Sequence, residues 1–198
     1  TDSLVGSEMC IRDRSGGQLV QGVPINRLSR KVVANELASI EMFENIEVKH
    51  NVDVGVDITF SELEEKHDAV FIGVGLSQGR FIPIGNYEHP AVHKGLEFLF
   101  DFNMRERWDL SKTRTIVIGG GDVAFDVARS ALRCAAPEVN LACLEREHLG
   151  EMPGSEDERV GGRREGVIFN DGWGPDEIII ENDKVCLLYT SPSPRDCQ

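Results

Sequence analysis

Apolar residues along this chain alternate between helical spacing and strand-like runs. From Ser29 to Glu44 they recur every three or four residues, which predicts an amphipathic helix, and the following IEVKH predicts a short strand. Thr59 with Glu62 three residues later is typical of a capped helix start. The apolar run DAVFIGVG at 68–75 predicts the next strand. Helices and strands are thus predicted to follow one another through the first part of the chain.

The second part of the chain continues the same alternation. Helices are predicted at 95–108 and 122–135, and strands at 114–119 and 139–145. Alternation of this kind is typical of a parallel sheet covered by helices on both faces. The predicted fold class is therefore α/β, with strands joined by helical crossovers.

Composition and charge narrow the classes of function. Of the 198 residues 40% are apolar, enough for a globular core, and no apolar run approaches the length that spans a bilayer. The first residues show neither a basic segment followed by an apolar one nor a small-residue cleavage site. A formal net charge of -13 argues against binding to nucleic acid or anionic lipid, which reward clustered Lys and Arg. We therefore expect a cytoplasmic protein with neither a nucleic-acid nor a membrane partner.

The cysteines and histidines form no recognisable metal-binding pattern. The five cysteines include no C-x-x-C pair, and the five histidines include no H-x-x-x-H spacing. We therefore predict no metal ligands here, and an odd number of cysteines fits a disulfide framework poorly. Cys134 and Cys143 lie where a helix and a strand would face the core, so we expect both to be buried free thiols.

The two ends of the chain are related to each other at the level of coding sequence. One choice of codons for TDSLVGSEMCIRD at 1–13 has a reverse complement that, read in a shifted frame, translates as CLLYTSPSPRDCQ at 186–198. Both ends also resemble translated transposase adapters of sequencing libraries. We therefore predict that residues 1–14 and 186–198 are artefactual, and that the insert between them is the middle of a longer gene.

The strongest chemical signal is TIVIGGGDVAFDVA at 115–128. Gly119, Gly121 and Ala124 fit G-x-G-x-x-G/A at the junction of a predicted strand and helix, which indicates a dinucleotide-binding loop. The first small residue permits a tight turn, the second lets the backbone approach a pyrophosphate, and the third lets helix and strand pack closely. The alternative is a glycine turn that binds no nucleotide. Asp122 is predicted to complement the helix dipole.

An acidic residue follows the next predicted strand at the spacing expected of a ribose partner. Glu145 is placed to accept hydrogen bonds from the adenosine ribose, which favours NADH because a carboxylate repels the 2′-phosphate of NADPH. Arg146 leaves NADPH open, since a neighbouring guanidinium could bind that phosphate. Arg163 and Arg164 could also reach a phosphate, although a charged helix before EGVIF explains them more simply.

Several motifs, in order and spacing, resemble the small subunit of glutamate synthase and the flavin module of dihydropyrimidine dehydrogenase. They are SGGQLVQGVPINRL, VGVDITFSEL, DAVFIGVG, IVIGGGDVAFDVARSALR, EMPGSEDE and REGV. In this family an FAD domain is interrupted by an inserted NAD(P) domain. The resemblance implies a partial FAD-binding Rossmann-like domain at 15–80, a connecting segment at 81–112 and a partial NAD(P)-binding Rossmann-like domain at 113–185.

The same resemblance implies cofactor contacts, residue by residue. For FAD the matching positions are Gly16, Gly17, Gln18, Arg27, Val54 and Gly75. For the nicotinamide nucleotide they are Gly120, Gly121, Asp122 and Val123, which join Gly119, Ala124, Glu145 and Arg146. The chain departs from the family at LEREH, where NADPH-using members carry arginines, and at IPIGNYE, where the family has an intact Ile-Pro-Gly step. The family's N-terminal FAD fingerprint and iron–sulfur cysteines have no counterpart, as expected of an insert cut at both ends.

The function implied is hydride transfer between NAD(P)H, with NADH favoured, and FAD, followed by electron transfer to an iron–sulfur domain or subunit. Hydride transfer to a flavin needs no acid–base side chain, so no catalytic residue is predicted. The alternatives are a single-nucleotide NAD-dependent dehydrogenase and a non-enzymatic NAD-sensing regulatory domain. Residues 15–185 lack the first βαβ unit of the FAD domain, so we expect this fragment to hold FAD poorly and to be inactive.

Overall fold

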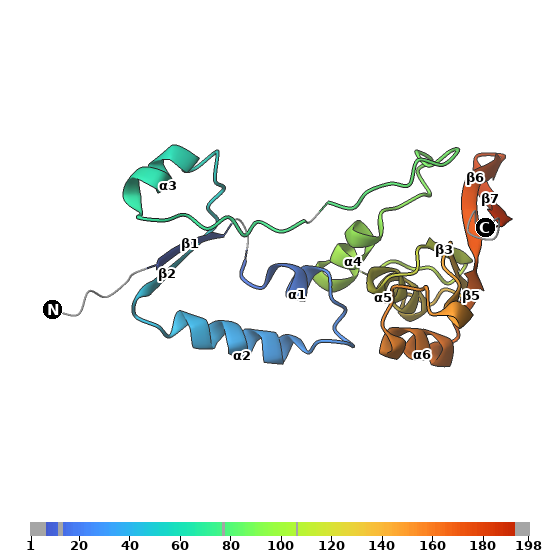
Figure 1. Cartoon of the computed structure of the whole chain (residues 1–198), viewed down its shortest axis with the longest axis horizontal. Helices are drawn as coiled ribbons and strands as arrows, with labels where there is room; N and C mark the ends of the chain where they lie inside the picture. The colour runs from blue at the N-terminus through green and yellow to red at the C-terminus, as the bar shows by residue number, and fades with distance from the viewer. Residues whose placement is uncertain (1–6, 12–13, 77, 106, 193–198) are drawn as a thin grey trace. The chain divides into compact units, whose positions relative to one another are not determined.

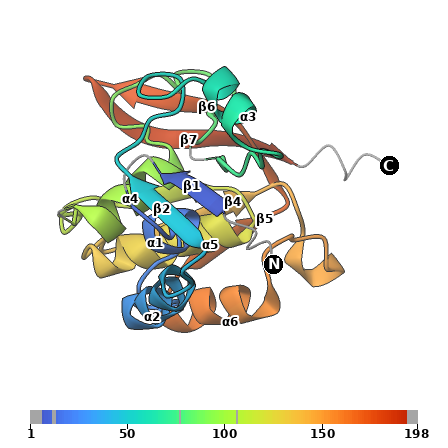
Figure 2. The same cartoon turned by 90° about the vertical axis from the view of Figure 1, so that its left-hand side faces the viewer.

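The computed structural model describes residues 7–11, 14–76, 78–105 and 107–192. The chain divides into two units, Thr1–Leu76 and Ser77–Gln198, and each is described by itself. Figures 1 and 2 show the helices and strands of both units from two directions. The predicted domain ranges stay predictions, because division into units does not show what each part binds.

The first unit is built on a parallel pair of strands joined by a helical crossover. Its elements are β1 (Ser7–Ile11), α1 (Gly17–Gln21), α2 (Arg30–Glu41), β2 (Ile46–His50) and α3 (Phe60–Lys66). β1 and β2 pair in parallel along their whole length, and α2 contacts β2. The helix predicted after Ser29 and the strand predicted at IEVKH are confirmed, although the helix ends at Glu41 rather than Glu44.

The start of α3 follows the capping box predicted from its sequence. The Thr59 hydroxyl accepts a hydrogen bond from the Glu62 backbone N–H at 3.2 Å. The Glu62 carboxylate in turn accepts one from the Thr59 backbone N–H at 2.8 Å. Two N–H groups that have no partner within the helix are thereby satisfied, which fixes where α3 begins.

The strand predicted at 68–75 is wrong. The structure assigns no strand to this segment, and no β-pairing is found for it among the described residues. Most of its side chains are open to solvent, with Phe71 95% and Val74 86% exposed. An apolar run forms a strand only when neighbouring strands satisfy its N–H and C=O groups, and this unit supplies none for 68–75.

The second unit contains a three-stranded parallel sheet with the order β3-β4-β5. Each strand pairs in register with the next, with Thr115 opposite Val139 and Asn140 opposite Ile168. The elements are α4 (Gly95–Met104), β3 (Thr115–Ile118), α5 (Asp122–Arg133), β4 (Val139–Cys143), η1 (Glu147–Leu149), α6 (Glu156–Glu165), β5 (Ile168–Asp171), β6 (Trp173–Glu181) and β7 (Lys184–Pro192). The strands predicted at 114–119 and 139–145 and the helix at 122–135 are confirmed, each slightly shorter than expected.

One face of this sheet carries the core of the unit. Leu141 and Phe125 are fully buried, and Phe125 of α5 stacks beside Phe169 of β5 at 5.4 Å between ring centroids. On the other face Ile116 and Ile168 remain about half exposed. The expectation of helices on both faces is therefore wrong for the described residues. Right-handed crossovers that step in one direction, from β3 to β4 to β5, place α5 and α6 on the same face.

The helix predicted at 95–108 is shorter than expected, because α4 ends at Met104. Beyond it the chain turns back so that the indole N–H of Trp108 donates to the Asp101 carboxylate at 3.2 Å. The same ring meets Phe98 edge to face at 5.1 Å. Trp108 therefore packs onto the helix it was expected to extend.

Strands β6 and β7 form an antiparallel hairpin. The turn residues Asn182 and Asp183 have φ angles of 50° and 59°, the left-handed conformation that tight hairpin turns require. β1 and β7 both include residues predicted to be artefactual. Because strand pairing joins backbone groups, it does not test the origin of these residues, and that prediction stays a prediction. Residues 1–6, 12–13 and 193–198 of the same two ends lie outside the described residues.

Candidate functional site

β3 leads directly into the predicted glycine loop. Gly119 has a φ of 132°, in the region that favours glycine, while its N–H donates to the backbone of β4 at 2.8 Å. Gly120 lies in a crowded position, since an added Cβ would stand 3.3 Å from Glu145 Oε2 and from Met152 Cγ. The first glycine is therefore needed for its conformation, and the second for the close approach of its neighbours.

Gly121 precedes α5 and leaves the start of this helix open. A Cβ added there would meet no atom within 4 Å, and no side chain of the described residues caps the helix. Helix N-termini bind phosphate through free N–H groups and the positive end of the helix dipole. Val123 is about half exposed in the first turn, whereas Ala124 is buried, with its Cβ 3.5 Å from the Cβ position of Gly119. The loop is thus crowded at Gly120 and accessible at Gly121.

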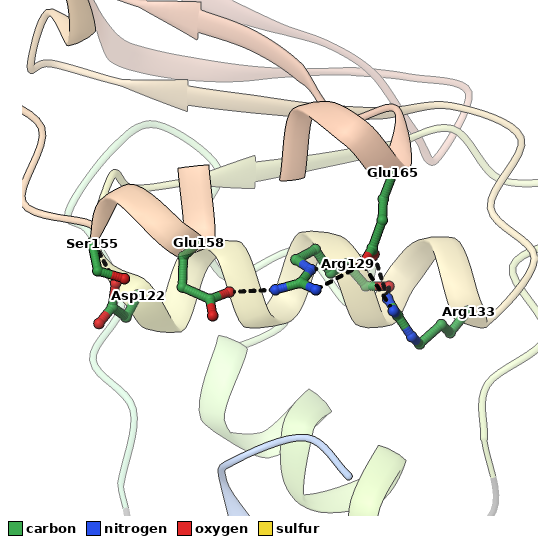
Figure 3. A network of polar contacts seen from close by, with 6 residues as sticks. All are labelled: Asp122, Arg129, Arg133, Ser155, Glu158 and Glu165. Carbon is green, nitrogen blue, oxygen red and sulfur yellow. Dashed lines mark hydrogen bonds and ion pairs between the residues drawn. The ribbon is translucent and has the colours of Figure 1, made fainter. Parts of the chain in front are cut away.

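A second loop, at 152–155, lies beside the glycine loop. The Asp122 carboxylate accepts a hydrogen bond from the Ser155 backbone N–H at 2.7 Å (Figure 3). Gly154 donates its N–H to the carbonyl oxygen of Gly120 at 2.8 Å. A side chain at Gly154 would not fit, because its Cβ would lie 2.4 Å from the Phe125 ring. We did not predict this contact from the sequence, in which the only sign of it was the glycine in EMPGSEDE.

Glu145 follows β4 and directs its carboxylate toward the glycine loop. Its Oε2 atom lies 3.3 Å from the Cβ position of Gly120. Because β3 and β4 are parallel neighbours, the ends of both strands meet at one edge of the sheet. The structure therefore brings the predicted ribose partner and the predicted phosphate loop together, and the ribose contact itself stays a prediction.

Cys143 lies beneath this edge as a buried thiol. Its Sγ–H donates to the Glu145 carbonyl at 3.4 Å. Burial, followed by the charges of Glu145 and Asp171, raises the pKa of Cys143 to about 11. Cys134 is also buried, and burial raises its pKa. Both thiols therefore stay protonated at neutral pH, and the prediction of two buried free thiols is confirmed.

The residues after Glu145 form two ion pairs. The Arg146 guanidinium binds the Glu151 carboxylate through Nε and Nη2, each at 3.2 Å. Glu147 forms an ion pair with Arg163 of α6. The Arg163 guanidinium also lies 4.2 Å from the centroid of the Phe169 ring. The helix predicted around Arg163 and Arg164 is confirmed as α6.

A network of charged side chains joins α5 to α6. Arg129 binds Glu158 at 2.6 Å and Glu165 at 2.7 Å, and Arg133 binds Glu165 at 2.5 Å (Figure 3). Hydrogen bonds from Arg133 and then Arg129 lower the pKa of Glu165 to about 2, although partial burial acts in the opposite direction. The hydrogen bond to Glu165 raises the pKa of Arg129. The network fixes α6, and with it the 152–155 loop that precedes it.

The residues matched to FAD lie in the first unit, at separate places along it. Gly16 and Gly17 precede and begin α1 with φ angles of 104° and 43°, followed by Gln18. The Arg27 side chain is exposed, and the Arg27 backbone N–H donates to the Pro24 carbonyl at 2.9 Å. Val54 forms an isolated bridge with Ile58, and Gly75 lies in the segment without secondary structure, with a φ of 70°. Their assignment to FAD stays a prediction.

The described residues carry neither a membrane-spanning helix nor a metal-binding cluster. No helix in this part of the chain is both long and apolar enough to cross a membrane. Nor does it contain a group of three or more His, Cys, Asp or Glu side chains that could hold a metal ion.

Some known proteins are similar to this chain in sequence, and others are similar in fold. No protein-family model matches the chain. One relative is the NAD-dependent dihydropyrimidine dehydrogenase subunit PreT of Escherichia coli O157:H7, to which the chain is 36% identical over 177 residues. The match covers 88% of this chain and 40% of that protein. Another is the glutamate synthase [NADPH] small chain of Halomonas elongata, to which the chain is 33% identical over 176 residues. This match covers 84% of this chain and 37% of that protein. The chain thus spans at most two fifths of these relatives.

A solved structure with a similar fold is also found. FprA of Mycobacterium tuberculosis, determined in complex with NADPH, matches with a TM-score of 0.74 at 19% identity, over 94% of this chain and 57% of that one. The likeness confirms the predicted α/β fold class. The resemblance found in the motifs is confirmed as well, and the chain is homologous to the oxidoreductase subunits represented by PreT and the glutamate synthase small chain.

Proposed function

We propose that the chain is part of an FAD-dependent NAD(P)H oxidoreductase whose nicotinamide nucleotide binds between Gly119 and Glu145. One observation carries the proposal. The glycine loop between β3 and α5 is accessible at Gly121, where the helix N-terminus is uncapped, and the Glu145 carboxylate faces the same loop. In the proposal, N–H groups that donate to a phosphate and a carboxylate that accepts from a ribose lie at one edge of a parallel sheet.

Each residue of this loop has a separate role in the proposal. Gly121 lets a pyrophosphate approach the N–H groups of the first turn of α5, which Asp122 and Val123 supply. Gly119 and Ala124 bring strand and helix close together. Asp122 positions the 152–155 loop through Ser155 and does not have to contact the nucleotide. Glu145 accepts hydrogen bonds from the ribose hydroxyls, and Arg146 borders the same position.

The flavin belongs to the first unit in this proposal. Gly16 and Gly17 both have positive φ angles, and Gly17 is open, since a Cβ added there would meet no atom within 4 Å. Gln18, Arg27, Val54 and Gly75 would complete the contacts by homology. When bound, FAD exchanges hydride with the nicotinamide and passes electrons on, so the chain has to hold and orient the two cofactors.

The electron acceptor in this proposal is an iron–sulfur domain or subunit. The names of the relatives support a partner in general, since PreT is a subunit and the Halomonas protein is a small chain. We favour NADH as donor because of Glu145, and a cytoplasmic location stays a prediction.

The nucleotide site can be tested by titrating the 198-residue chain with NADH and following its fluorescence. Gly121→Ala should weaken NADH binding at least about tenfold, because a methyl group in the open position would keep a phosphate from the backbone. Thermal unfolding is the control and should not change, since the added Cβ meets no atom within 4 Å and the backbone there is extended. Equal NADH affinity in both proteins would contradict the site.

Flavin absorbance of the natural parent protein tests the other half of the proposal. A parent that purifies with bound flavin supports the two-cofactor enzyme. An intact, colourless parent would leave only the single-nucleotide dehydrogenase or the NAD-sensing domain.

A further inference from the structure

The residues around Glu145 carry more negative than positive charge, unlike a site that binds a 2′-phosphate. Four acidic residues lie at or just beyond the ends of β4 and β5, namely Glu145, Glu147, Glu151 and Asp171. Two of them bind the neighbouring guanidiniums, as Glu151 pairs with Arg146 and Glu147 pairs with Arg163. The Asp171 carboxylate accepts a hydrogen bond from the Glu147 backbone N–H at 2.8 Å, which holds Glu147 in place. Carboxylates outnumber guanidiniums here, so an added phosphate meets net negative charge.

We propose that Glu147 and Glu151 determine nucleotide selectivity, by engaging the two arginines that could otherwise bind the 2′-phosphate of NADPH. The inference rests on the nucleotide site proposed above. In that site Glu145 excludes the phosphate directly. Glu147 and Glu151 add a second barrier, since each would have to give up its guanidinium before a phosphate could take it.

Arg163 is the arginine better prepared to bind a phosphate. It is about half exposed, and its guanidinium lies over the Phe169 ring, which holds it independently of Glu147. Removing the Glu147 charge should therefore leave Arg163 in place with its donors available. Arg146 is more enclosed, with its Cγ 3.3 Å from the Cβ position of Gly172. We therefore expect removal of the Glu147 charge to raise NADP⁺ affinity more than removal of the Glu151 charge.

The test measures dissociation constants of NAD⁺, NADP⁺, 5′-AMP and adenosine 2′,5′-bisphosphate for the 198-residue chain. Glu147→Gln should raise the affinity for NADP⁺ and for the bisphosphate about tenfold, and Glu151→Gln should raise it about threefold. The affinities for NAD⁺ and 5′-AMP should change less than about twofold. The gain should shrink as ionic strength rises, because it depends on charge.

Two further variants separate this role from a structural one. Glu156→Gln removes an exposed carboxylate of α6 for which no ion pair is found among the described residues, and it should leave all four constants unchanged. Adding Arg163→Met to Glu147→Gln should abolish the gain for NADP⁺, because the guanidinium that binds the phosphate is then absent. A merely structural effect of Glu147 would change NAD⁺ and NADP⁺ alike.

The outcomes distinguish failure of the inference from failure of the proposed site. If NAD⁺ binds in a manner that depends on Gly121 but Glu147→Gln does not raise NADP⁺ affinity, the selectivity role is overturned and the site stands. If the chain binds neither NAD⁺ nor NADP⁺, both are overturned.

Discussion

Two segments of this chain have the same sequence pattern and different structures. TIVIGGG at 115–121 and DAVFIGVG at 68–75 each combine an apolar run with closely spaced glycines, and each predicts a strand. The first forms a strand of a parallel sheet, with Val117 buried, that leads into a helix. The second has no strand, and Phe71 and Val74 are open to solvent.

The difference lies in what the surrounding chain provides. β3 finds its partner β4 after one crossover, and α5, which makes that crossover, covers both strands. The 68–75 segment has no pairing partner among the described residues of its unit. A local pattern therefore predicts which residues can form a buried strand, and the availability of neighbours decides whether they do so.

The core below β3 should respond most strongly to mutation. Phe125→Ala removes a fully buried ring, and we expect the free energy of unfolding of the second unit to fall by about 3–5 kcal/mol. Both tryptophans, Trp108 and Trp173, lie in this unit, so denaturant unfolding followed by tryptophan fluorescence measures it without a signal from the first unit. A loss below about 1 kcal/mol would show that the core is loosely packed.

The α5–α6 network should contribute an intermediate, pH-dependent amount. Glu165→Gln should cost about 2 kcal/mol at neutral pH, since it takes charge from a half-buried cluster. The pKa of Glu165 is lowered to about 2 in the folded chain, so this stabilisation is complete above its usual pKa of 4.5 and is lost as pH falls toward 2.

Unfolding experiments at neutral pH and near pH 3 test this expectation. The wild-type chain should lose more stability between the two than the Glu165→Gln variant. Glu156→Gln, at an exposed position of the same helix, is the matched control and should follow the wild type. Identical acid sensitivity of the wild-type and Glu165→Gln chains would rule out the network as its source.

The edge of the sheet at Glu145 should affect binding more than folding. Glu145→Ala should weaken NADH about tenfold, equivalent to about 1.4 kcal/mol, and NADPH less, so that selectivity for NADH falls. Titrating the chain with both nucleotides measures the ratio of the two affinities. An unchanged ratio would remove Glu145 from the ribose contact.

Mutation in the exposed 68–75 segment should change the free energy of unfolding least. Phe71→Ser changes a side chain that is 95% exposed, so the free energy of unfolding should shift by no more than about 0.5 kcal/mol. Circular dichroism follows the unfolding of the whole chain. A loss comparable with that of Phe125→Ala would mean that 68–75 is buried in solution, which would erase the contrast between the two segments.

The sequence predicted those features that depend on neighbours along the chain. The Thr59 capping box, β2, and the junction from β3 to α5 all follow from periodicity and spacing over a few residues. The position of Glu145 beside the glycine loop followed from its place at the end of the next parallel strand.

Features that depend on contacts across many residues could not be found in this way. Gly154 meets Gly120, and Glu165 meets Arg129, only because α6 packs against α5, and no local pattern indicates which charges will pair. The face of the sheet covered by helices was also predicted incorrectly, since strand order decides it. In each case tertiary packing selected one of several arrangements that the sequence pattern allowed.

The hydrogen bond from Gly154 to the carbonyl of Gly120 also limits how the glycine loop can move. Peptide groups in glycine-rich loops can rotate to present either N–H or C=O to a ligand, but this peptide can rotate only if the bond to Gly154 breaks. A dinucleotide would therefore meet a loop whose shape is already set. The entropy cost of ordering that loop is met during folding, so less of the binding energy is lost when the nucleotide arrives.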